Sequence, residues 1–291
     1  MAIAGSVAEI IFELKHNNFY EKITSVIDMG DQDVNLSYEE IINNLNKFNV
    51  KHNQELFALA KNFPSRPRVS SSVLWQSLGI KTTDKIDMIE LDRPANQKVG
   101  KVYKHDLNFP LRDKDLIEKY DLVTDFGNNE HPFNFIEAFI TMHKLCKEKG
   151  YLMIHQGLFR GNGFVNFDVS FFENYAAVNN YSIMHSCLVF TFPNNIFFST
   201  PVKRDFLTTV DINKVENISI FYLLKKEKRG DFKFPYQDHG SAWQSNEMYK
   251  MKFSYNDEMP TKLYIPFQSE KKTNIKNLLK KFIKKILNFN G

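Results

Sequence analysis

The stretch Ser25-Val26-Ile27-Asp28-Met29-Gly30-Asp31-Gln32-Asp33 decides the fold. An apolar run ends in an acid and a glycine, which is typical of a buried strand that breaks into a tight turn. Such a turn presents its backbone N–H groups and side chains at the carboxyl edge of a parallel sheet, where open α/β folds bind their ligands. We therefore expect an α/β fold whose ligand site begins at Gly30.

The residues after Gly30 indicate which ligand this turn accepts. A dinucleotide-binding turn has two further glycines, which let the backbone approach a pyrophosphate. This chain has Gln32, Asp33 and Val34 at those places. Because carboxylates repel a pyrophosphate, the turn favours a nucleoside-like ligand that is cationic or zwitterionic. S-adenosylmethionine has this chemistry, with a sulfonium, an ammonium and no phosphate.

Length and composition predict one large domain, or one domain with an insertion, since 43% of the 291 residues are apolar. The only cysteines, Cys146 and Cys187, are too few for a disulfide framework and favour buried thiols. No basic segment precedes the apolar residues at the amino terminus, and no apolar run reaches the roughly 18 residues of a membrane span. We expect a cytoplasmic protein.

The basic charge is confined to the end of the chain. Residues 269–291 contain seven lysines and one acid, whereas the whole chain carries only +4. Because a nucleic-acid enzyme usually has a basic working face, this distribution argues against a nucleic-acid partner.

The same terminal segment has a helical pattern over residues 273–289. Its apolar residues cover about half of a helical wheel, and its lysines lie opposite. A basic amphipathic helix of this kind either lies on an anionic membrane surface or packs on its own domain. We therefore divide the chain into an α/β domain, 1–268, and a C-terminal helix, 269–291.

Apolar periodicity along 1–268 predicts alternating helices and strands. The expected helices span residues 5–20, 38–48, 53–62, 71–78 (with Gly79 as its stop) and 133–147. The expected strands span residues 23–30, 87–92, 120–124, 151–155, 182–192 and 218–224, with a further strand ending near His105. The first two strands are about twice as far apart as a minimal βαβ unit requires, so residues 36–68 read as an inserted helical cap.

Two acids follow expected strands at positions where nucleoside sites use them. Asp92 ends the 87–92 strand, where a carboxylate can receive ribose hydroxyls, and Glu90 is the alternative. Asp106 follows the next strand and can accept the adenine amine, while the backbone N–H of Leu107 faces the ring. The other interpretation of Asp106 is an Asx turn before Pro110.

A second signal lies in Asp125-Phe126-Gly127-Asn128-Asn129-Glu130-His131. It follows the 120–124 strand and precedes the 133–147 helix, whose positive end faces it. A loop with an amide, an acid and an imidazole at a ligand edge predicts a reaction centre. The alternative is that Glu130 and His131 only cap the helix.

From Ser25 to about Tyr181 the chain resembles a class I S-adenosylmethionine-dependent methyltransferase, of the bacterial small-molecule and glycan-associated type. The resemblance is carried by residues 26–30, Asp92, 106–108, 125–131 and 149–155. It implies a Rossmann-like, doubly wound, mostly parallel seven-stranded sheet. The cofactor contacts that it implies, with Asp33 added at the methionine end, are Asp28, Gly30, Asp33, Asp92, Asp106, Leu107, Asp125, Phe126 and Gly127. The run Asp31-Gln32-Asp33 departs from relatives that have more glycine there.

Histidines supply the candidate bases. His131 and Glu130 are expected beside the transferred methyl group, and His155, at the end of its strand, is the competing base or a structural histidine. His131, His143 and His155 lack dense ligand spacing, so no metal is expected. Downstream, Phe171, Phe172 and Tyr175 read as core more than as acceptor site.

We therefore expect methyl transfer from S-adenosylmethionine to an oxygen or nitrogen of a small polar acceptor, such as a sugar or cell-surface glycan precursor. A non-catalytic partner subunit of the same fold and a nucleoside-cofactor oxidoreductase are the alternatives. The sequence gives no oligomeric state.

Overall fold

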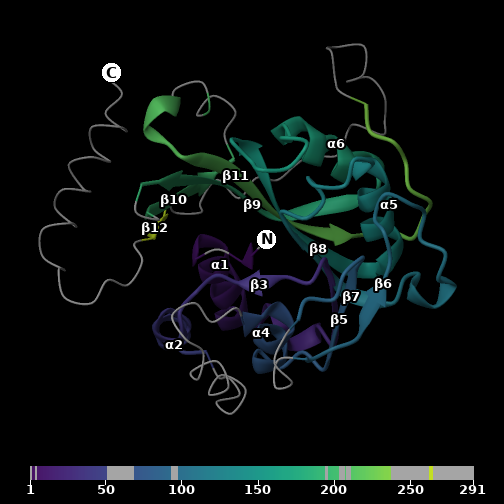
Figure 1. Cartoon of the computed structure of the whole chain (residues 1–291), viewed down its shortest axis with the longest axis horizontal. Helices are drawn as coiled ribbons and strands as arrows, with labels where there is room; N and C mark the ends of the chain where they lie inside the picture. Colours follow the sequence, from purple (N-terminus) through teal and green to yellow (C-terminus); the bar gives the residue numbers. More distant parts are fainter. Residues whose placement is uncertain are drawn as a thin grey trace, which may run out of the picture.

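The computed structural model describes residues 2–3, 5–50, 69–92, 98–193, 196–202, 207, 211–236 and 262–264. These residues build a nine-stranded sheet in the order β12-β10-β9-β11-β8-β7-β2-β5-β6 (Figure 1). Its parallel part contains β6 (Val102–Lys104), β5 (Thr82–Asp87), β2 (Ser25–Met29), β7 (Tyr120–Phe126) and β8 (Cys146–Phe159). Antiparallel pairing continues it through β11 (Asn217–Lys226), β9 (Tyr181–Phe192), β10 (Ile196–Pro201) and β12 (Lys262–Tyr264).

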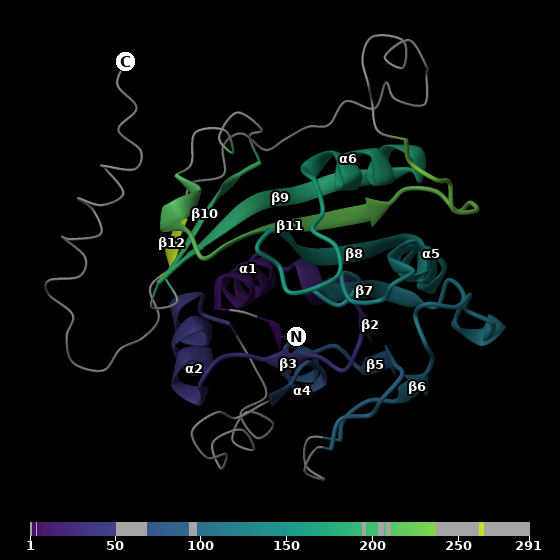
Figure 2. The same cartoon turned by 45° about the horizontal axis from the view of Figure 1, so that its top comes forward.

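Helices cover both faces of this sheet (Figure 2). On one face lie α1 (Gly5–His16), α2 (Tyr38–Lys47) and α4 (Ser71–Ser77), and on the other lie α5 (Phe135–Leu145) and α6 (Val169–Val178). Successive residues of β2 serve the two faces in turn, as the pleat of a strand requires. Val26 packs in the cluster with α1 and α4, and Ile27 packs in the cluster with α5. The predicted Rossmann-like, doubly wound α/β fold is confirmed.

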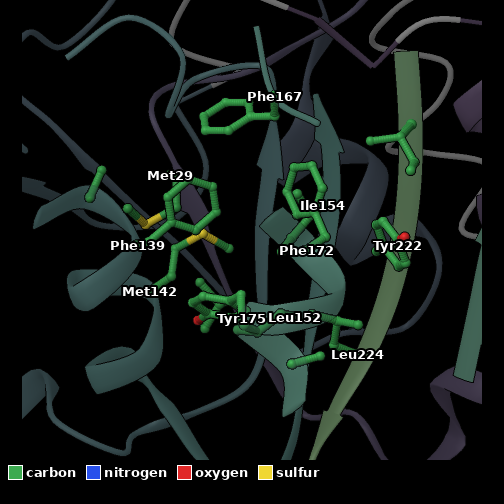
Figure 3. Packing of buried hydrophobic residues seen from close by; sticks show 14 of the residues in the cluster. Met29, Phe139, Met142, Leu152, Ile154, Phe167, Phe172, Tyr175, Tyr222 and Leu224 are labelled. Atoms are coloured by element: carbon green, nitrogen blue, oxygen red, sulfur yellow. The ribbon is translucent and has the colours of Figure 1, made fainter. Parts of the chain in front are cut away.

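The α5–α6 face has an aromatic core (Figure 3). Phe139 of α5 contacts Phe171 and Tyr175 of α6 with ring centroids 4.9 and 5.6 Å apart. Phe172 and Tyr175 are fully buried. The interpretation of this aromatic run as core is therefore confirmed, and ring contacts join α6 to α5.

A small second sheet lies beside the carboxyl end of β2. It joins β1 (Ala2–Ile3), β3 (Asp33–Val34) and β4 (Val69–Ser70). Ser70 also caps α4 by accepting a hydrogen bond from the backbone N–H of Ser72. The connection from β2 to β5 is thus held by β3 near its start and by β4 near its end.

Most expected elements are observed, and one strand is misplaced. The predicted 87–92 strand is wrong: β5 ends at Asp87, and residues 88–92 form an exposed loop. The apolar residues Met88, Ile89 and Leu91 that suggested a strand are exposed instead. The structure also adds β10 and β12 to the seven expected strands, and β8 extends well beyond the predicted residues 151–155 at both ends.

Two of the predicted segments lie outside the part of the chain that the structure describes. The 53–62 helix and the 269–291 segment lie outside the described residues, so the inserted cap is seen only through α2 and the residues up to Val50. Among the helices that the structure describes, none is both long and apolar enough to cross a membrane.

Candidate functional site

Gly30 marks the edge at which the parallel strands end. Its backbone N–H donates to Ile86 O at 2.8 Å, which ties the turn to β5. It has a φ of +87°, and a Cβ at this position would lie 2.8 Å from Asn128 Oδ1 in the loop after β7. Gly30 therefore satisfies two requirements, a left-handed turn and close approach of the β7 loop.

The next residues are fixed by buried polar contacts. Asp31 forms an ion pair of 2.8 Å with Lys85 of β5, and both side chains are almost fully buried. Gln32 Nε2 donates to Met29 O at 2.7 Å. Asp33 lies in β3, paired with Ala2 and Ser70. Because Lys85 neutralises Asp31, this turn is less anionic than its sequence suggests.

Asp28 is locked into the sheet. It is fully buried, and Trp75 Nε1 donates to its Oδ1 at 3.0 Å while the hydroxyls of Ser71 and Thr124 also donate to it. Burial raises the pKa of the Asp28 carboxyl. Asp28 joins α4 to β2 and β7 beneath the site, and its contact with a cofactor stays a prediction.

The acid at the end of β5 is Asp87, not Asp92. The Oδ2 of Asp87 accepts the N–H of Asp31 at 2.7 Å, and its Oδ1 accepts the N–H of Ile89 at 3.0 Å. Since a carboxylate has about four lone-pair sites, Asp87 retains capacity for a hydroxyl ligand. Asp92 and Glu90 are exposed in the following loop. Sequence reasoning missed Asp87 because the apolar residues after it extended the apparent strand.

Asp106 follows β6 and forms the Asx turn that was its alternative interpretation. Its Oδ1 accepts both the backbone N–H and the Nδ2 of Asn108, at 2.9 and 2.8 Å. These bonds lower the pKa of the Asp106 carboxyl. The neighbouring Leu107 is buried in the core cluster with α5. The Asx turn uses only Oδ1, so Asp106 Oδ2 can still accept a hydrogen bond from an amine. The Asx-turn and adenine-binding interpretations of Asp106 are therefore compatible.

Asp125 and its neighbours shape the loop after β7. Asp125 is fully buried, and it accepts the N–H groups of Asn128 and Asn129 at 2.8 and 3.2 Å and a bond from Gln156 Nε2. Burial raises the pKa of Asp125 to about 7. Gly127, with a φ of +80°, lets the chain turn there.

Phe126 is also a structural residue. Its ring stacks on Trp75 with centroids 6.3 Å apart, on the face that α4 covers. Both Asp125 and Phe126 are buried in the protein, and their contact with a cofactor stays a prediction.

Glu130 lies in a cradle made by the end of β8 and the glycine-rich loop that follows it. Gly157 N donates to its Oε2 at 3.2 Å. A Cβ on Gly163 would lie 2.5 Å from Glu130 Cγ, and one on Gly161 would lie 3.4 Å from Oε2. Burial raises the pKa of the Glu130 carboxyl. The spacing of these glycines is what lets the loop close over Glu130.

His131 lies next to this buried acid. Its Nε2 is 3.7 Å from Glu130 Oε1, and its side chain is 37% exposed. The Nε2 atom itself is buried and has no hydrogen-bond partner among the described residues. An acceptor oxygen and an unbonded ring nitrogen thus face each other slightly too far apart to bond directly.

His155 and His143 lie apart from the Glu130–His131 pair. His155 pairs across the sheet with Phe126 and Phe221, which belong to the α1–α4 face. Its Nε2 lies 2.8 Å from Ser219 Oγ, and burial lowers its pKa to about 4. The structure therefore separates His155 from Glu130.

His143 is bonded within the core. It contacts Gly230 O at 2.8 Å and the Tyr181 hydroxyl at 3.0 Å, and burial lowers its pKa to about 4. No group of three metal-ligating side chains occurs among the residues that the structure describes.

The carboxylate acceptors at this edge fit the hydroxyl and amine donors of the adenosyl half of S-adenosylmethionine. Asp87 offers carboxylate oxygens to ribose hydroxyls, and Asp106 Oδ2 offers one to the adenine amine. Met88 and Ile89, which are 52% and 62% exposed, supply apolar surface next to Asp87. The side chains of Asp31 and Gln32, which follow Gly30, are buried.

No protein-family model matches the chain, and no curated protein matches its sequence. The solved structures that it resembles are class I S-adenosylmethionine-dependent methyltransferases. One is the Burkholderia thailandensis 1,6-didemethyltoxoflavin-N1-methyltransferase with S-adenosylhomocysteine, at 10% identity and a TM-score of 0.41, covering 76% of this chain and 79% of that one.

Two further structures give the same outline. The O-methyltransferase from a trans-AT PKS multienzyme of Brevibacillus brevis is 12% identical, with a TM-score of 0.39, 75% of this chain and 71% of that one covered. A TehB-like methyltransferase from Corynebacterium glutamicum is 12% identical, with a TM-score of 0.37 and 74% and 87% covered. At these values the likeness carries no argument about function, which rests on this chain's own residues.

Proposed function

We propose that this protein transfers a methyl group from S-adenosylmethionine to an oxygen or nitrogen of a small acceptor. The observation that carries the proposal is the order of polar groups along one edge. Asp87 at the end of β5 offers an acceptor for a hydroxyl, and Asp106 after β6 offers an acceptor for an amine. The Glu130–His131 pair after β7 offers an unbonded imidazole nitrogen.

In this proposal Asp87 holds the ribose and Asp106 the adenine amine. Bound there, S-adenosylmethionine would supply a sulfonium methyl group, to which the acceptor's lone pair bonds while the sulfur keeps the electron pair of the broken S–C bond. The protein's main task is to place the acceptor atom in line with that methyl group. Asp28 and Asp125 contribute by fixing the strand ends from below.

His131 and Glu130 act on the acceptor. An O–H or N–H group of the acceptor would donate to His131 Nε2, which has no hydrogen-bond partner among the described residues. Glu130 Oε1 lies 3.7 Å from the same nitrogen. Imidazole exchanges protons near neutral pH. His131 would therefore take the acceptor proton as the new bond forms, and Glu130 would stabilise the charged ring.

Titration calorimetry with S-adenosylmethionine, S-adenosylhomocysteine and NAD tests the cofactor. We expect both adenosyl ligands to bind and NAD not to bind. The exposed Asp92→Ala variant is the matched control and should bind as the wild type does. Binding of NAD alone would replace this proposal with a nucleoside-cofactor oxidoreductase.

Label transfer identifies the acceptor. The protein is incubated with methyl-labelled cofactor and a panel of nucleotide sugars, phenols and amines, and products are followed by mass spectrometry. The sugar or glycan precursor expected from the sequence is one arm of this panel. Cofactor binding without transfer to any arm would favour a non-catalytic partner subunit.

A further inference from the structure

Two phenylalanines next to the Glu130–His131 pair are strongly exposed. Phe133 is 85% and Phe164 is 74% exposed, although their rings contact each other edge to face with centroids 6.2 Å apart. Large apolar side chains exposed together mark a surface that binds something. The loops that carry these rings adjoin the Glu130–His131 pair, which connects this surface with the candidate reaction centre.

The backbone holds the pair at this position. Phe164 N donates to Glu130 O at 2.8 Å, so the β8 loop is anchored directly to the acid. The preceding Gly163 allows this approach, because a Cβ there would clash with Glu130. Phe133 follows His131 by two residues and comes from the β7 loop. The two rings therefore stand on loops that meet at Glu130.

The polar side chains around the pair are already used within the protein. Asn134 donates through its backbone N–H to Asn108 Oδ1 at 2.9 Å and through its Nδ2 to Asn108 O at 3.1 Å. Asn166 Oδ1 accepts the N–H of Gly161 at 2.9 Å. A sugar needs many unbonded donors and acceptors, whereas a planar apolar ring needs ring faces and edges. The surface beside His131 supplies the latter.

We propose that Phe133 and Phe164 form the acceptor subsite and select a planar aromatic ring that carries the reacting O–H or N–H group. The role of this surface as an acceptor subsite rests on the proposed function. Binding of an aromatic ring to it does not require turnover. The ring packs on the two phenylalanines, and its O–H or N–H is directed toward the Glu130–His131 pair.

Equilibrium binding tests the subsite without any reaction. 2-Naphthol is titrated into the full-length protein, with and without S-adenosylhomocysteine, and its fluorescence is followed. Its saturated analogue 2-decalol and the sugar nucleotide UDP-glucose are the comparison probes, measured by calorimetry. We expect 2-naphthol to bind more tightly than either.

The variants Phe133→Ala and Phe164→Ala should each weaken 2-naphthol binding roughly three- to ten-fold, the range of an aromatic pair contact. Both should leave the melting temperature and S-adenosylhomocysteine affinity unchanged, because both side chains are exposed. Met184→Ala, which removes a 51% exposed side chain on β9, is the matched control and should have no effect.

Equal affinity for 2-naphthol in the wild type and both phenylalanine variants would overturn the subsite. Tighter binding of UDP-glucose, lost in the same variants, would overturn the aromatic class and restore the sugar. If 2-naphthol behaves as expected while S-adenosylhomocysteine fails to bind, the proposed cofactor is wrong and the ring-binding surface stands.

Discussion

Asp28 and Glu130 are both buried carboxylates near the carboxyl ends of neighbouring strands, yet their partners differ in kind. Asp28 is held by side chains from α4 and β7, and all of them belong to the core. Glu130 is held by backbone N–H from a glycine-rich loop, and its Oε1 faces His131. A carboxylate fixed by core side chains supports the fold, whereas one cradled by backbone keeps an oxygen for a ligand.

The largest effect is expected on the Asp28 side of this comparison. Asp28→Ala leaves Trp75 Nε1 and the hydroxyls of Ser71 and Thr124 buried without their acceptor. At about 1–3 kcal/mol for each of the three unmet groups, the free energy of unfolding should fall by roughly 3–9 kcal/mol. Urea unfolding followed by circular dichroism measures it.

Ser71→Ala provides a milder variant in case Asp28→Ala does not fold. It removes one hydroxyl donor, which is about 1 kcal/mol of stability. A folded Asp28→Ala protein with wild-type stability and lost cofactor affinity would instead return Asp28 to the cofactor site.

The opposite behaviour is expected of His131. His131→Ala should lower turnover roughly 10²–10⁴-fold, the range for losing a general base, while S-adenosylhomocysteine affinity stays nearly unchanged. The loss should be smaller for an acceptor that is already deprotonated. Steady-state kinetics with the acceptor found by label transfer measures both.

His155→Ala is the matched control for His131. Because His155 bonds Ser219 on the other face of the sheet, its variant should keep most of its turnover. Loss of turnover in His155→Ala with full turnover in His131→Ala would move the base to β8.

Asp87 extends the comparison to the cofactor. Asp87→Ala should weaken S-adenosylmethionine binding by about 1–3 kcal/mol, or roughly 5- to 150-fold, because buried ribose hydroxyls would lose their acceptor. Asp92→Ala should change nothing, since Asp92 is exposed. Calorimetry measures the affinities, and the melting temperature checks that loss of the Asp31 N–H bond has not unfolded the loop. The reverse order of effects would restore Asp92.

The same comparison explains how far the sequence could be interpreted. Periodicity placed β2, β7 and the helices, because their apolar residues pack on defined faces. It failed at β5, where Lys85 and Asp87 inside a real strand are polar and Met88 and Ile89 after it are apolar. Lys85 is buried only because Asp31 pairs with it, and a pairing between distant residues has no local pattern.

The site shows the same limit. Glu130 and His131 were recognisable as an acid and an imidazole in a loop after a strand. The glycine cradle was not, because Gly157, Gly161 and Gly163 meet Glu130 only in the folded chain. The partners of Asp28 in α4 could not be predicted, because an acid before a turn glycine has the same sequence pattern whether it faces a ligand or the helix beneath.

The smallest expected effect concerns Asp125, whose partners combine the two kinds. It accepts two backbone N–H groups and one amide side chain. Its pKa of about 7 lies above the ordinary value of 3.8, with burial as the main cause. The folded chain therefore binds more protons than the unfolded chain between these values. This contribution to stability is complete below about pH 4 and is lost as the pH rises through about 7.

His143 and His155 act in the opposite direction, because burial lowers their pKa values to about 4. Stability from these two histidines is present above about pH 6.5 and is lost as the pH falls toward 4. The wild-type profile thus contains opposing contributions, and only a variant can separate them.

Asp125→Asn removes only the loss of stability that Asp125 causes as the pH rises. Its Oδ1 can still accept the two backbone N–H groups, and Gln156 can turn its amide so that its unbonded Oε1 accepts from the new Nδ2. Relative to the wild type, the variant should gain up to about 2 kcal/mol of unfolding free energy between pH 5 and pH 8. Urea unfolding at both pH values measures the difference. If the unfolding free energies of the two proteins differ by the same amount at pH 5 and pH 8, Asp125 keeps one protonation state over this range. In that case the backbone hydrogen bonds affect its pKa more than its burial does.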